Sequence, residues 1–164
     1  MSDERWLNAE QQQAWRAFLA TSALLHAALD RQLQREAGIP HAYYMVLAML
    51  SESPGRALRM SQLAAATNSS QSRISHAVAR LEEAGWVRRE QCPHDRRGLV
   101  AVLTDAGLAV LAEAAPGHVR AVREHLFDQL SPEQVRQLEA ICRAALRQLD
   151  PANTFPAVQA TAVR

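Results

Sequence analysis

The sequence predicts a mainly α-helical protein with one small β-hairpin. Three observations support this fold class. Apolar residues recur at spacings of three and four over most of the 164 residues. Near the middle, a short helical pattern, a tight turn and a second helical pattern are followed directly by two short apolar runs with turn-forming residues between them. The length fits one domain with appended helices, and 48% hydrophobic residues suffice for a sizeable core.

The first quarter of the chain predicts one long helix and the start of a second. The long helix extends from Glu10 to about Glu36, and Gly38 and Pro40 end it. The next helix covers about residues 41–51, and the stretch SESPGRA breaks it. Both helices carry broad apolar stripes, which predict extensive packing.

The segment from Met60 to Ala84 predicts a helix-turn-helix. A short helix spans about residues 61–67, and Asn68 forms the turn because its side chain tolerates a left-handed backbone. A second helix then covers about residues 70–84 and is capped by the Ser70 side chain.

The second of these helices has two opposed faces. At about 100° per residue, one face is apolar and consists of Ile74, Ala77, Val78 and Leu81. The opposite face is polar and consists of Ser72, Arg73, His76 and Arg80. Arginine can bond to guanine with two hydrogen bonds, serine can read either base edge or a phosphate, and the small Ala79 permits close approach. These features suit a helix that enters the DNA major groove.

The stretch CPHDRRGLVAVLTDAG predicts a hairpin with a charged tip. Residues 86–90 and 99–103 form its strands, and Pro93, His94, Asp95 and Gly98 are turn formers. Asp95, Arg96 and Arg97 therefore lie at the tip. A hairpin directly after a helix-turn-helix makes the unit a winged helix, whose tip arginines can enter the narrow, electronegative minor groove.

Two more helices complete the predicted fold. Thr104 caps a helix that extends to about Leu130, with a kink near Pro116 and Gly117. The sequence SPEQ, beginning at Ser131, is a capping box that starts a last helix ending near Leu149. Residues 150–164 are expected to form a disordered tail.

The charge distribution agrees with a nucleic-acid partner. The net charge is only +1, yet residues 54–98 contain eight arginines against four acidic residues. There is no apolar run long enough for a membrane span and no signal-peptide core, which predicts a cytoplasmic protein. The sequence shows no Gly-rich phosphate loop, nucleophile elbow or metal-ligand cluster, so we expect neither an enzyme nor a cofactor.

The quoted motifs resemble the MarR family of bacterial transcriptional regulators. The resemblance extends over about residues 10–149; it is carried by the run from Leu63 to Arg73, by RLEEAGWVRRE, and by DRRG followed by VLTDAG. At the turn, this chain has Asn68 and Ser69 where the family often has a glycine and an apolar residue, which leaves the start of the reading helix open.

The resemblance implies a homodimer held by residues 10–40 and 104–149, with residues 41–103 as the winged helix-turn-helix that binds double-stranded DNA. It assigns the major groove to Ser70, Gln71, Ser72, Arg73 and His76, to which the polar face adds Arg80. It places a wing arginine, Arg96 or Arg97, in the minor groove, oriented by Asp95. The expected function is a repressor of a palindromic operator, released by a small aromatic or phenolic effector.

Several alternatives stay open. Cys92 in the wing is either a redox trigger or an inert thiol. The winged helix could also serve protein interaction without specific DNA reading, although the arginines argue against it. An effector pocket is one interpretation of His26, His41, Tyr43 and Tyr44, and ordinary packing is the other. His94, His118 and His125 are expected to be surface residues rather than zinc ligands, because no cysteine or carboxylate completes a ligand set.

Overall fold

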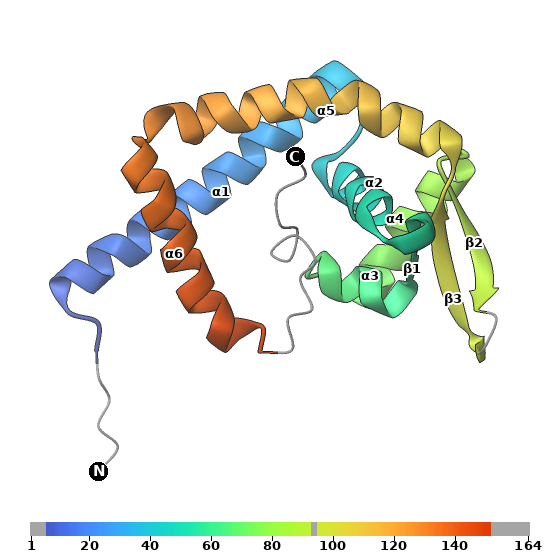
Figure 1. Cartoon of the computed structure of the whole chain (residues 1–164), viewed down its shortest axis with the longest axis horizontal. Helices are drawn as coiled ribbons and strands as arrows, with labels where there is room; N and C mark the ends of the chain where they lie inside the picture. The colour runs from blue at the N-terminus through green and yellow to red at the C-terminus, as the bar shows by residue number, and fades with distance from the viewer. Residues whose placement is uncertain (1–5, 93–94, 152–164) are drawn as a thin grey trace, which may run out of the picture.

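The computed structural model describes residues 6–92 and 95–151, with the side chains of residues 95–97 outside the described part. The fold is mainly helical with one small antiparallel sheet, which confirms the predicted fold class (Figure 1). In chain order the elements are α1 (Ala9–Ala37), α2 (His41–Glu52), η1 (Pro54–Arg56), β1 (Ala57–Arg59), α3 (Met60–Ala66), α4 (Gln71–Glu83), β2 (Val87–Cys92), β3 (Asp95–Leu103), α5 (Asp105–His125), η2 (Phe127–Gln129) and α6 (Pro132–Leu149).

Local capping chemistry sets most helix boundaries. The Ser70, Thr104 and Ser131 side chains accept hydrogen bonds from the first turns of α4, α5 and α6, as the sequence predicts. Gly38 ends α1 in the left-handed conformation, with φ of 68°. Asn68 adopts φ of 47° in the turn between α3 and α4, as expected.

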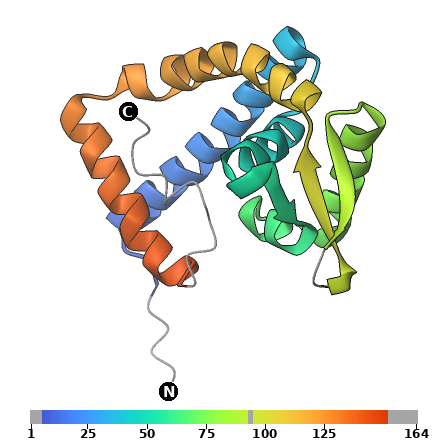
Figure 2. The ribbon, with the colours of Figure 1, turned by 45° about the vertical axis from the view of Figure 1, so that its right-hand side comes forward.

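One core holds the winged helix-turn-helix together. Side chains from α2, α3, α4 and the sheet are fully buried in it, among them Leu47, Leu50, Leu63, Val78 and Leu81. The end of α1 adds Leu33, and the first half of α5 adds Leu111 and Ala114. Helices α1 and α5 therefore join the winged helix-turn-helix at one end only (Figures 1 and 2).

The structure corrects the sequence analysis in the sheet. A third strand, β1, pairs with β3, so the strand order is β1-β3-β2. The hairpin strands are also longer than predicted. Asp95 to Gly98 belong to β3 instead of the turn, and the pairing of Cys92 with Asp95 extends the ladder. Asp95, Arg96 and Arg97 thus begin a strand at the far end of the hairpin.

The predicted helix from Thr104 to Leu130 is also too long. It ends at His125, and the short helix η2 turns the chain toward α6. The helix continues through Pro116 without interruption.

The terminal helices expose apolar side chains. None of the α6 residues is buried, and α6 makes few contacts with other described elements. Large apolar residues are at least two fifths exposed along α1, α5 and α6: Trp15, Phe18, Leu19, Leu24, Val119, Ile141 and Leu149. No helix in the described part of the chain has the length and apolar character needed to cross a membrane.

Candidate nucleic-acid interface

Helix α4 presents the polar face that its sequence predicts. Ile74, Val78 and Leu81 are buried against the core on one side. The opposite side is exposed and carries Ser72, Arg73, His76 and Arg80; Gln71, in the first turn, is exposed as well. Burial of one face fixes the helix on the domain, so the other face projects to solvent as a rigid surface.

The turn before α4 settles where this helix begins. Asn68 and Ser69 take the place of the glycine and apolar residue expected from the family pattern, and the Ser69 amide donates to the carbonyl of Ala64 at 2.9 Å. Ser70 is the N-cap, and its hydroxyl accepts from the Arg73 amide at 3.3 Å. The helix therefore starts at Gln71, and Ser70 acts first as a cap.

The two arginines on this face differ in whether their guanidinium groups are already paired. The Arg80 guanidinium is paired with the Glu83 carboxylate at 2.9 Å. In contrast, Arg73 makes no side-chain hydrogen bond or ion pair with the described residues, and neither does His76. Arg73 is thus the guanidinium on α4 that is free to bond to an external acceptor.

The wing is fastened to α4 at its base. The Glu82 carboxylate accepts from the Arg89 amide at 3.0 Å and from Arg89 Nε at 2.8 Å. These bonds from Arg89 lower the pKa of Glu82, so the carboxylate stays ionised at neutral pH. Sequence analysis missed this link, because no local spacing rule connects residues seven apart across a helix end and a strand.

The start of α5 is docked on the turn between α4 and β2. The Thr104 hydroxyl donates to the Gly85 carbonyl at 2.8 Å, and the Thr104 amide donates to the Trp86 carbonyl at 3.0 Å. Gly107 lies so close that a Cβ there would stand 2.1 Å from the Trp86 carbonyl oxygen. This close approach gives the glycine of the VLTDAG motif a physical role.

The tip of the wing remains a prediction. β3 places the backbone of Asp95, Arg96 and Arg97 at the far end of the hairpin, and a bulge lies between Gln91 and Cys92. The side chains of these three residues, and Pro93 and His94 altogether, fall outside the described residues. Their expected roles therefore rest on the sequence.

Three histidines meet where α1, α2 and α5 come together. The centroid of the His41 ring lies 5.8 Å from that of His26 and 5.5 Å from that of His118. The ring centroids of Tyr44 and His118 are 4.4 Å apart. Of the four residues considered for an effector pocket, all but Tyr43 belong to this cluster of rings, which meet at tilted or edge-on angles. Burial lowers the pKa of His41 and of His118, and the other two imidazoles lower that of His41 further.

These lowered pKa values predict a pH-dependent stability. Since the unfolded chain binds protons at these histidines more readily than the folded one, the free energy of unfolding should be highest above about pH 6.5 and decrease as the pH falls below it. Urea unfolding at pH 7.5 and 5.5, at one protein concentration, would measure this loss. His118→Gln should make it smaller, and an unchanged pH dependence in that variant would contradict the prediction.

The thiols are free, and the described residues show no metal-binding cluster. Cys92 is buried and Cys142 is exposed, and both are free. A redox trigger at Cys92 would require the end of β2 to open. No group of three His, Cys, Asp or Glu residues in the described ranges is placed to hold a metal ion, and His94 lies outside them.

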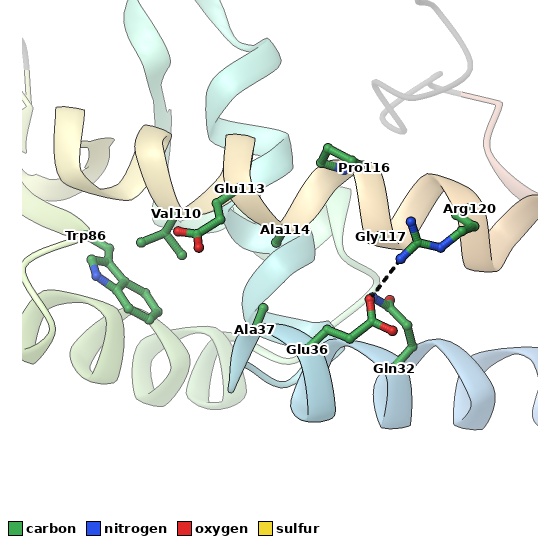
Figure 3. Close-up of a pocket in the computed structure, with 10 residues that line it drawn as sticks. All are labelled: Gln32, Glu36, Ala37, Trp86, Val110, Glu113, Ala114, Pro116, Gly117 and Arg120. Atoms are coloured by element: carbon green, nitrogen blue, oxygen red, sulfur yellow. Dashed lines mark hydrogen bonds and ion pairs between the residues drawn. The ribbon is translucent and has the colours of Figure 1, made fainter.

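A pocket lies between α1, α5 and the base of the wing. Its volume is about 470 Å³, and Figure 3 shows Trp86 at one end and the Glu36–Arg120 pair at the other. The lining also includes Gln32 from α1 and Val110, Glu113 and Gly117 from α5. Sequence analysis did not identify this pocket, because its walls come from segments distant in the chain.

Comparisons with known proteins agree with this arrangement. Residues 37–98 match a family model described as MarR family. The crystal structure of Sco3205, a MarR family transcriptional regulator from Streptomyces coelicolor, in complex with DNA, is 54% identical; the match covers 92% of this chain and 94% of that one, with a TM-score of 0.86. AbsC, a MarR family regulator from the same organism, is 45% identical over 88% of this chain and 97% of that one, with a TM-score of 0.82.

A curated relative is more distant. The transcriptional repressor MprA of Escherichia coli (strain K12) is 32% identical over 113 residues, which is 69% of this chain. The match spans 64% of the length of MprA, a little under two thirds.

Proposed function

The chain belongs to the MarR family of transcriptional regulators, and from that premise we propose that it is a homodimeric repressor that binds a palindromic DNA operator. The observation that carries the proposal is the exposed face of α4, where Ser72, Arg73 and His76 stand opposite a fully packed apolar face. An exposed arginine without a protein partner, on a helix held rigidly from behind, can bond to a guanine edge at little conformational cost.

The relatives support the DNA partner and the repressor role. Sco3205, which shares more than half of its residues with this chain, was crystallised with DNA. MprA is a transcriptional repressor. A protein that occupies its operator over a promoter represses by excluding the polymerase.

The dimer follows from the uncovered terminal helices. Apolar side chains on α1 and α6 face solvent in the isolated protomer. Because such patches are rare on monomers, a second copy is their natural partner. Two reading helices about 34 Å apart would then contact half-sites one helical turn apart on a palindromic operator.

The decisive experiment is a footprint on the DNA upstream of the protein's own gene. We expect protection of an inverted repeat, with half-site centres about ten base pairs apart. Protection of a single half-site, or no protection beyond that seen on random DNA, would contradict the proposal. A winged helix that serves protein interaction alone would leave no footprint.

For the wing, the direction in which two substitutions change DNA affinity distinguishes an oriented arginine from a simple positive patch. Arg97→Ala should weaken binding most at A·T-rich flanks, where the minor groove is narrow, and reduce the salt slope by roughly one unit for each phosphate that the variant no longer neutralises. Asp95→Asn should also weaken binding, although it removes a negative charge, because it releases the oriented guanidinium. Fluorescence anisotropy over a salt series measures both. If Asp95→Asn instead increased the affinity equally for all DNA sequences, the wing would act only as a positive patch.

We further propose that a small molecule releases the operator. The observation in favour is the pocket between the terminal helices and the wing base, since a ligand there touches both parts of the protomer. A redox response through Cys92 is the second candidate, and the burial of that thiol gives it less support. Loss of an oxidant response in Cys92→Ser would favour it over the ligand.

A further inference from the structure

We propose that the pocket between α1, α5 and Trp86 binds an organic cation with a flat apolar body, such as an aromatic ammonium compound. The effect of this ligand on operator binding rests on the proposed function, whereas the existence of the binding site does not. The volume, about 470 Å³, is in the range of small-molecule sites.

A buried acceptor without a partner identifies the pocket as a site. Gln32 is only 5% exposed, and its Nε2 donates to Glu36 Oε2 at 2.8 Å. Its Oε1 has neither exposed surface nor a hydrogen-bond partner within the described structure. An orphaned buried acceptor costs free energy, and a donor from a ligand would satisfy it.

The charges around the pocket favour a cation. The lining contains two carboxylates, Glu36 and Glu113, and one guanidinium, Arg120. Arg35, outside the lining, also pairs with Glu36 at 2.9 Å, so the negative charge that remains without a counter-charge is that of Glu113. Hydrogen bonds from Gln32 and Arg35 lower the pKa of Glu36, and so does the charge of Arg120, so this carboxyl is ionised at neutral pH. Glu113 has no ion-pair or hydrogen-bond partner in the described part of the chain, which leaves its charge uncompensated. An aromatic acid would add a third carboxylate here.

The contact between Arg120 and Glu36 is the weak point of the pocket wall. Arg120 Nη2 stands 3.5 Å from Glu36 Oε2, at the limit of a hydrogen bond, and the guanidinium is well exposed. A ligand ammonium can compete with it for Glu36 and, once Arg120 moves aside, donate to Gln32 Oε1. Arg120 therefore opposes cation binding, and its removal should strengthen it.

The opposite end of the pocket suits an aromatic body. The Trp86 side chain lines this end beside Val110 and Glu113, and Ala37 and Ala114 lie between this end and the Glu36–Arg120 pair (Figure 3). A flat apolar group there buries hydrocarbon surface, and its positive charge gains attraction from the indole face. Since the Trp86 backbone holds both the end of α4 and the start of α5, a ligand on this ring bridges the reading helix and the dimer helices.

Three matched probes test the site by isothermal titration calorimetry without DNA: 1-naphthylmethylammonium, 1-naphthylmethanol and 1-naphthoate. They share one ring system and differ in charge. We expect the ammonium to bind at least about tenfold more tightly than the naphthoate, with the alcohol between them. Equal or tighter binding of naphthoate, or no binding of the ammonium at millimolar concentration, would overturn the proposal.

Variants with opposite expected signs separate the site from general effects. Glu113→Gln should weaken ammonium binding about tenfold, whereas Arg120→Gln should tighten it severalfold. Gln32→Met, which keeps the shape of the side chain but removes the acceptor, should weaken it severalfold. Glu10→Gln is the control: it removes an exposed carboxylate from the first turn of α1, more than twenty residues before Gln32 and outside the lining of this pocket, and should change nothing. Weaker binding in Arg120→Gln would contradict the assignment.

The regulatory role needs a second measurement. Operator affinity with and without saturating 1-naphthylmethylammonium should differ at least fivefold, and the operator should change ammonium affinity by the same factor. An unchanged operator affinity would overturn the regulatory role. Failure of the unliganded protein to bind any operator would instead contradict the proposed function. The calorimetric test of the ligand site, which uses no DNA, would not be affected.

Discussion

Arg73→Ala should abolish high-affinity operator binding. A bidentate contact to a guanine contributes about 1–3 kcal/mol of discrimination, and a dimer carries two copies of the residue. If the half-sites act independently, the loss is about 2–6 kcal/mol, or roughly 30-fold to more than 10⁴-fold in affinity. Affinity for random DNA should change far less, because non-specific binding depends on many phosphate contacts.

Anisotropy titrations with operator and random duplexes at one salt concentration would measure both effects. Arg16→Ala is the matched control: it removes one exposed arginine from α1, distant from α4 in the fold, and should leave operator affinity unchanged. A selection of binding sites from a random library should show that Arg73→Ala loses its preference at one base pair per half-site. An equal loss on operator and random DNA would mean that Arg73 contacts only phosphate.

Ile141→Glu should convert the dimer to monomers. Ile141 is 67% exposed on α6 in the isolated protomer, and α6 has no buried residue of its own. Burial of an isoleucine side chain contributes about 1.5–3 kcal/mol, and an unpaired carboxylate in its place adds a desolvation cost. With two copies per dimer, a total near 6 kcal/mol would raise the dimer dissociation constant by about 10⁴-fold.

Sedimentation velocity at micromolar concentration would show the change in mass, and a footprint would show the accompanying loss of operator binding. Leu99→Glu is the control, since Leu99 is also an exposed apolar residue but lies in β3 of the wing. That variant should stay dimeric. A folded wild-type monomer at the same concentration would contradict the homodimer and with it the palindromic operator.

Local chemistry made a large part of this fold predictable from the sequence. Ser70, Thr104 and Ser131 cap the helices that they were expected to cap, because an N-cap depends only on residues within one turn. The two faces of α4 were equally predictable, since burial there follows the helical period. The polar face that supports the proposed function was therefore visible in a stretch of about ten residues.

Boundaries that depend on neighbouring elements were predicted less well. Strand β1 has only three residues and forms because β3 offers it a free edge. The pairing of β2 with β3 likewise places Asp95 in a strand, although its residue type favours a turn. At the other end of the chain, α5 gives way to η2 after His125 without a proline or glycine to mark the change.

What the sequence determined by itself was the order of the six helices and the hairpin, the polar face of α4 and membership of a family with the proposed DNA partner. Only the tertiary structure showed the Glu82–Arg89 link, the approach of Gly107 to Trp86, and the pocket that joins Gln32 to Trp86. The physical reason is the distance along the sequence over which each kind of interaction acts. Capping and amphipathic periods act over a few residues and leave a mark in the local sequence. A pocket or a contact between distant segments depends on how whole helices pack, which no short stretch of sequence records.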